Sequence, residues 1–222
     1  MSIHAMSSKQ ASAVKRGGHK REEKFNRKMG YDDAEINWSG SSADCLIDPE
    51  KLSPSLEEWI TKKGISLEGG VSMKGGNTLQ FHLGNIPELT DKQNYSTAKN
   101  NKGQTCVDHG ISFEDQLRSL RSPEFWSKYL RKGELLCYED EESEEYNYFK
   151  MSDVISYICG ECDWRILPTG RLKGDFHGKQ ILTYEYRKKK KSFVLGAHGG
   201  ENGKKFIKLL KDKIDVLVES SQ

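Results

Sequence analysis

The amino-acid sequence predicts a fold of the α/β (α+β) class, because segments with helical periodicity alternate with short runs that have the period of strands. The chain has 222 residues, of which 35% are hydrophobic, and this suffices for one core of moderate size. Strand patterns occur at 71–74, 78–83, 180–187 and 192–197. Helical patterns occur at 19–29, 54–63, 112–120, 122–132, 153–158 and 204–219.

The distribution of these patterns predicts how the chain is organised. We expect residues 1–18 to form a flexible N-terminal arm and residues 19–222 to form a single domain. The polar stretch between two parts of that domain, about 19–90 and about 106–222, is expected to be a long loop. The formal net charge is only +2, but charges of one sign gather in blocks, so local fields matter more than the total.

Several features exclude other protein classes. No apolar stretch approaches the roughly 20 residues that span a bilayer. The N-terminal residues are polar and contain no apolar signal core. The five cysteines, an odd number, are expected to be reduced thiols. Together these features predict a cytoplasmic protein.

The most informative stretch predicts a β-hairpin over 71–83, with a glycine-containing turn at 75–77. Strand alternation places Ser72 and Lys74 on one face, opposite the apolar residues between them. A lysine that faces away from the core next to acidic residues suits catalysis better than packing.

A second informative position is Asp44, which follows a turn-rich run and precedes the short apolar strand Cys45-Leu46-Ile47. A carboxylate at the mouth of a strand, with small neighbours, suits Mg²⁺, which requires rigidly held oxygen ligands and access for water. The alternative is that Asp44 only caps a turn.

The order of Ala43-Asp44, Ser72-Met73-Lys74 on a strand and then Glu88 resembles the rearranged active site of certain type II restriction endonucleases of the PD-(D/E)XK superfamily. In that subgroup, serine replaces the acid two residues before the lysine, and a glutamate from a following helix takes its place. The resemblance covers Arg21 to Leu89 and implies a restriction-endonuclease-like central mixed sheet flanked by helices, with a helix before the aspartate strand.

This resemblance implies a Mg²⁺-dependent endonuclease that hydrolyses duplex DNA at a specific short site. Asp44 and Glu88 would be the metal ligands, and Lys74 would contact the scissile phosphate and orient water, while Ser72 leaves room for Glu88. The spacer between Asp44 and Lys74 is short for the subgroup, so Glu68 is a rival to Glu88. A homodimer is expected, together with a cognate methyltransferase that belongs to the same system but is not bound.

Further residues are predicted to assist the site or bind DNA. Glu23, on a helix before the sheet, and Gln80 are accessory candidates. A basic C-terminal hairpin is expected, and its lysines and their neighbours would contact phosphates: Arg171, Lys173, Lys188, Lys189, Lys190 and Lys191. The alternative for this hairpin is a solvated turn that protects a sheet edge by charge.

Two alternatives to the leading function stay open. One is a non-catalytic DNA-binding protein that uses the same lysines, and the other is a repair or structure-specific nuclease. The spacing of Cys106, His109, Cys159 and Cys162 also permits a zinc site, although a pair of cysteines at a helix end is more often only buried.

Overall fold

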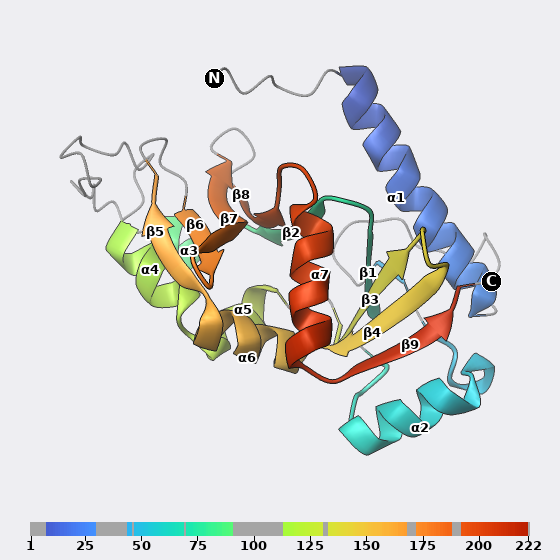
Figure 1. Ribbon diagram of the computed structural model, residues 1–222. Helices are drawn as coiled ribbons and strands as arrows, with labels where there is room; N and C mark the ends of the chain where they lie inside the picture. Colours follow the sequence, from blue (N-terminus) through green and yellow to red (C-terminus); the bar gives the residue numbers. More distant parts are fainter. Residues whose placement is uncertain are drawn as a thin grey trace. The chain divides into compact units, whose positions relative to one another are not determined.

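The structure is a computed structural model that describes residues 8–29, 44–45, 47–68, 70–90, 113–130, 133–167, 172–187 and 192–221. The chain divides into two units, each built from separate segments (Figure 1). Unit 1 comprises Met1–Gly75, Lys132–Tyr148 and Leu217–Gln222, and unit 2 comprises Gly76–Arg131 and Phe149–Val216. The units therefore interleave along the sequence, whereas the prediction divided residues 19–222 into consecutive parts.

Unit 1 is organised around a mixed four-stranded sheet. The order of its strands is β1-β3-β4-β9, and β1 is parallel to β3. The four residues between β3 and β4 permit only an antiparallel connection between these neighbours. The elements of this unit are α1 (Ser8–Lys28), η1 (Pro49–Lys51), α2 (Pro54–Lys63), β1 (Val71–Gly75), β3 (Leu135–Asp140), β4 (Glu145–Lys150) and β9 (Val216–Ser220).

The core of unit 1 forms because alternate residues of the strands face two amphipathic helices. Strand residues two apart, such as Val71 and Met73, are buried against apolar side chains of α1 and α2. On α1, the ring of Phe25 packs edge-on against Tyr146 with centroids 5.5 Å apart. Helix α1 thereby lies along the sheet (Figure 1), and its Lys28 donates to the carbonyl of Ser220 at the end of β9.

Unit 2 is organised around an antiparallel five-stranded sheet of order β2-β8-β7-β6-β5. Helix α7 packs on β7 and β8, and aromatic rings of Trp126, Trp164 and Tyr184 form the centre of a core cluster. The elements are β2 (Leu79–Gly84), α3 (Pro87–Thr90), α4 (Phe113–Leu120), α5 (Pro123–Tyr129), α6 (Met151–Glu161), β5 (Asp163–Ile166), β6 (Leu172–Phe176), β7 (Lys179–Arg187), β8 (Ser192–Ala197) and α7 (Asn202–Lys213).

The predicted class is confirmed, since mixed and antiparallel sheets are flanked by helices, but the predicted hairpin over 71–83 is wrong. Strand β1 pairs with β3 and strand β2 pairs with β8, so the two runs belong to different sheets. The glycine-rich link between them resembles a hairpin turn in sequence, but local turn chemistry does not decide which strand becomes the partner.

Both ends of the described chain also differ from the prediction. Helix α1 begins at Ser8, earlier than the expected helix from residue 19. The last predicted helix, 204–219, ends instead at Lys213 and is followed by β9. The β-branched residues Val216 and Val218 favour a strand here, and pairing with β4 provides its hydrogen bonds. Among the described residues, no helix is both long and apolar enough to cross a bilayer.

Candidate active site

A single β-bridge holds Asp44 beside strand β1. Cys45 donates its N–H to the carbonyl of Val71 over 3.0 Å, and Val71 donates back to Cys45 over 2.8 Å. Because this pairing is antiparallel, the residue before Cys45 lies opposite the residue after Val71. The bridge therefore sets Asp44 opposite Ser72, with both residues of the bridge itself buried in the core.

The side chains of Asp44, Ser72 and Lys74 meet at one carboxylate oxygen. Ser72 Oγ donates to Asp44 Oδ2 over 3.2 Å, and Lys74 Nζ donates to the same oxygen over 2.5 Å. Lys74 Nζ also donates to the carbonyl of Met73 over 2.8 Å. The side chains of Lys74 and Asp44 are 14% and 19% exposed, so they are largely shielded yet reachable from solvent. This cluster brings together three of the predicted site residues.

The acid of α1 that faces this cluster is Glu22. An α-helix turns about 100° per residue, so Glu22 projects about 60° from the buried Phe25 and Glu23 about 160° from it. Burial and the charge of Asp44 raise the pKa of Glu22, although the nearby His19 and Lys74 oppose the shift. The prediction selected Glu23, but Glu22 is the acid whose pKa responds to Asp44, and its backbone carbonyl accepts from the Sγ of Cys45, the neighbour of Asp44, over 3.9 Å.

The other candidate carboxylates are Glu88 in unit 2 and Glu68 in unit 1. Glu88 begins the first turn of α3 in unit 2, where Lys128 and Tyr129 donate to its carboxylate and lower its pKa to about 2. Its role as a second metal ligand stays a prediction. Glu68 is exposed in the turn before β1, and its backbone N–H donates to Ser66 Oγ over 3.4 Å.

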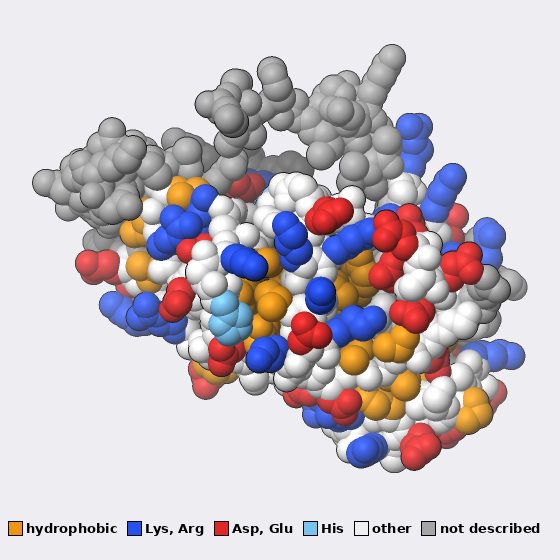
Figure 2. Space-filling model, viewed as in Figure 1, with side chains coloured by type: hydrophobic (Ala, Val, Ile, Leu, Met, Phe, Trp, Pro, Cys, Tyr) orange, Lys and Arg blue, Asp and Glu red, His pale blue; other side chains and the backbone are white. Residues whose placement is uncertain are grey.

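Apart from Glu23 on α1 in unit 1, the predicted accessory and DNA-binding residues fall in unit 2 or outside the described residues. Gln80 on β2 and Lys173 on β6 are half-buried in unit 2. Strands β7 and β8 pair with Arg187 opposite Ser192, but Lys188–Lys191 between them and Arg171 lie outside the described residues. In the space-filling view, basic and acidic side chains are interspersed (Figure 2).

The cysteine pattern gives no support for a zinc site. Cys106 and His109 lie outside the described residues, while Cys159 and Cys162 are free thiols at the end of α6. Burial raises the pKa of Cys159 to about 11. Within the described ranges, no group of three or more histidine, cysteine or acidic side chains is placed to hold a metal ion.

Two relevant acids were missed by the sequence prediction, and each had a signal in the sequence. Glu22 is three residues before Phe25, the spacing that places two side chains on one side of a helix. Glu139 continues the alternate row of Leu135 and Cys137 and is 3% exposed. Comparison of the chain with known protein families, curated proteins and solved structures finds no match.

Proposed function

We propose that unit 1 carries the active site of a Mg²⁺-dependent nuclease that hydrolyses phosphodiester bonds. The observation that carries the proposal is the pairing of Lys74 with Asp44 over 2.5 Å, at the end of a strand and beside Glu22. A largely shielded ion pair without a function is a weak source of stability, because desolvation offsets much of its attraction. A cation beside two carboxylates is, by contrast, what phosphate hydrolysis requires.

The donor set fits a magnesium ion. Mg²⁺ commonly binds one or two protein carboxylates and completes its shell with waters and substrate phosphates. Asp44 and Glu22 supply two such groups. Burial and, after it, the charge of Asp44 raise the pKa of Glu22, and a divalent cation would relieve the repulsion between the two carboxylates. When bound, the metal would supply Lewis-acid stabilisation of the charge that develops on the phosphate.

The protein side chains have separate roles in this proposal. Lys74, whose ammonium group reaches the Asp44 carboxylate, neutralises the phosphate and orients the attacking water. Ser72 donates to Asp44 and so holds the carboxylate in one orientation. In this proposal Glu22 takes the place that the sequence prediction gave to Glu88, because the charges of Asp44 and Lys74 act on Glu22.

The finer proposal is a type II restriction enzyme that cuts duplex DNA at a short specific site as a homodimer. It is supported by the resemblance of Asp44, Ser72-x-Lys74 and their order along the chain to that group of enzymes. A two-fold dimer presents equivalent active sites to the two strands of a palindromic site. A cognate methyltransferase would protect the host DNA without being part of this complex.

The test is cleavage of phage DNA in the presence of Mg²⁺. We expect the wild type to give discrete fragments and Asp44→Ala and Lys74→Ala each to lower the rate by about 10²- to 10⁴-fold. Glu22→Gln is expected to fall in the same range, and Lys62→Ala, an exposed lysine on α2 of the same unit, serves as the matched control.

Each alternative has its own outcome in this experiment. Binding of DNA by the wild type without cleavage would favour the non-catalytic DNA-binding protein. A smear instead of discrete fragments would favour a repair or structure-specific nuclease. If Glu88→Gln or Glu68→Gln abolished cleavage while Glu22→Gln retained it, the choice of Glu22 would be overturned.

A further inference from the structure

We propose that Glu139 is a positioning residue that fixes the rotation of α1 and thereby keeps Glu22 beside Asp44. This inference rests on the proposed nuclease function for its catalytic consequence. The link between Glu139 and the orientation of Glu22 is made by the side chains of Arg21 and Lys24.

Glu139 is the one buried carboxylate among the described residues, with 3% of its surface exposed. It lies on β3 in the row that begins with Leu135 and Cys137, so it faces α1 where an apolar residue would be expected. Burying a carboxylate is costly unless cations or donors compensate it. An acid at this place therefore calls for an explanation beyond packing.

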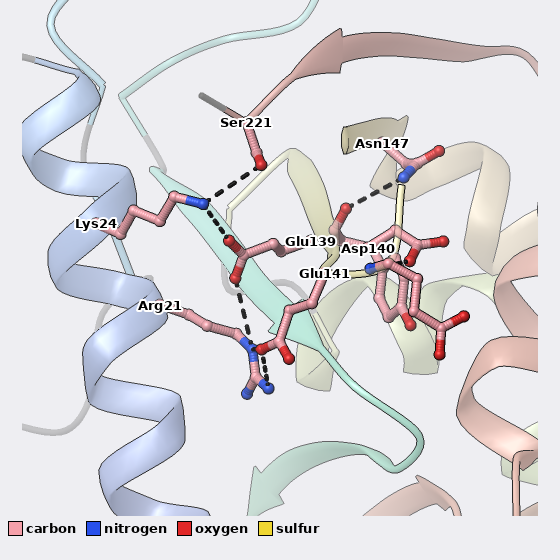
Figure 3. Close-up of polar contacts among 9 residues, drawn as sticks. Arg21, Lys24, Glu139, Asp140, Glu141, Asn147 and Ser221 are labelled. Carbon is pink, nitrogen blue, oxygen red and sulfur yellow. Dashed lines mark hydrogen bonds and ion pairs between the residues drawn. The ribbon is translucent and has the colours of Figure 1, made fainter. Parts of the chain in front are cut away.

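Two cations of α1 provide the compensation (Figure 3). Lys24 Nζ donates to Glu139 Oε1 over 2.9 Å, and Arg21 Nε lies 3.5 Å from Glu139 Oε2. Lys24 also donates to Ser221 Oγ over 3.3 Å, and Arg21 donates to Glu141 Oε1 over 2.6 Å from Nη2. Both cations come from one turn of the helix that carries Glu22.

The helix geometry connects this ion-pair cluster to the active site. At about 100° per residue, Arg21 and Lys24 lie about 60° apart, whereas Glu22 lies about 100° from Arg21 on the other side. The buried Phe25 falls between Arg21 and Glu22 on this projection. The ion pairs and the Glu22 carboxylate thus lie on opposite sides of Phe25, and anchoring the ion pairs fixes the direction of Glu22.

The strand register places Glu139 and its ion pairs at the end of β1, the strand that carries Lys74. Glu139 is the register partner of Gly75, which directly follows Lys74. A Cβ on Gly75 would lie 2.7 Å from Arg21 Nε, so the Arg21 side chain crosses β1 where glycine leaves room. Side-chain contacts and strand pairing therefore hold α1, β1 and β3 together at this point.

The experiment compares Glu139→Gln with Glu141→Gln, a matched control that also contacts Arg21 but has a side chain 60% exposed. We expect Glu139→Gln to change the NMR shifts of the Glu22 and Asp44 amides and to slow Mg²⁺-dependent cleavage by about 10- to 100-fold. The control should leave both unchanged. In a Glu22→Gln background, the substitution at Glu139 should cause little further loss, because its effect is exerted through Glu22.

The outcomes separate this inference from the proposed function. Full additivity of the two substitutions, or equal effects of the Glu139 and Glu141 variants, would overturn the positioning role. If the wild type does not cleave DNA, the proposed function fails, and the amide shifts alone then decide whether Glu139 orients α1. Should Glu139→Gln fail to fold, Lys24→Met, at a side chain 49% exposed, must change the shifts of the same amides or the inference is rejected.

Discussion

At the scale of single residues, the candidate site depends on one oxygen atom that accepts two donors. Ser72 Oγ and Lys74 Nζ both donate to Asp44 Oδ2, so the carboxylate is held from the strand side. Ser72 is 1% exposed, so its hydroxyl needs this partner. The serine has a structural task as well as the small size that the sequence prediction assigned to it.

This task leads to a prediction for Ser72→Ala. Loss of the hydroxyl removes one hydrogen bond to a carboxylate, and we expect the free energy of unfolding to fall by about 1–2 kcal/mol. Urea titration measures the change. Ser66→Ala, at an exposed residue before the same strand, should stay within about 0.5 kcal/mol of the wild type. Equal losses in the two variants would show that the Ser72 bond contributes nothing specific.

The residues of the site were predictable to different degrees. Strand alternation correctly separated Met73, which is buried in the core, from Ser72 and Lys74, which meet Asp44. The choice between Glu22 and Glu23 required the rotation of α1, which depends on tertiary packing. The sequence alone contains both acids at adjacent positions and gives no direct measure of that rotation.

At the scale of elements, β1 owes its place to contacts on both of its sides. The bridge from Cys45 holds one side, and the parallel pairing with β3 holds the other. Parallel partners are distant along the chain, in this case by about sixty residues of intervening sequence. Glycine-rich links such as 75–77 signal a local hairpin, so a sequence prediction prefers the nearer strand.

The close approach of α1 to β1 predicts the effect of Gly75→Ala. The new Cβ would overlap Arg21 Nε and Cδ and would lie 3.2 Å from the carbonyl of Glu139. We expect the free energy of unfolding to fall by about 1–3 kcal/mol, since the arginine must leave its place. Thermal or urea unfolding measures this loss.

Gly18 on α1 provides a control, because an alanine there is expected to raise the free energy of unfolding. A Cβ on Gly18 meets no atom within 4 Å, and the residue lies inside the helix. Gly18→Ala should therefore raise the free energy of unfolding by about 0.5–1 kcal/mol. If Gly75→Ala left the free energy of unfolding unchanged while Gly18→Ala raised it, the tight contact between α1 and β1 would be contradicted.

At the scale of the whole molecule, the two units interleave along the chain. Unit 1 is completed by β9 and the residue after it, which bind segments far away in sequence: Glu219 on β9 accepts from Ser53 and Ser55, and Ser221 accepts from Lys24. The fold class was predictable because it follows from local periodicity. The interleaving was not, because it depends on which distant strands pair.

The position of β9 near the end of the chain gives a prediction about truncation. A chain that ends after Asp215 loses β9 and the contacts of Glu219 and Ser221, and we expect its melting temperature to fall by roughly 5–10 °C. Limited proteolysis should then cut within unit 1 first. Val218→Thr, at a residue 40% exposed on the same strand, should melt like the wild type. Unchanged melting of the truncated chain would show that β9 is dispensable.

The position of β9 in the chain also sets an order of assembly during synthesis. A chain is made from its N-terminus, and domains can fold as they emerge. Helix α1 and strand β1 emerge first, but the strand that closes their sheet follows both segments of unit 2. The Lys24–Ser221 contact can form only after β9 has been synthesised. Until nearly all the described residues have been made, the sheet that carries the candidate nuclease site therefore lacks its last strand.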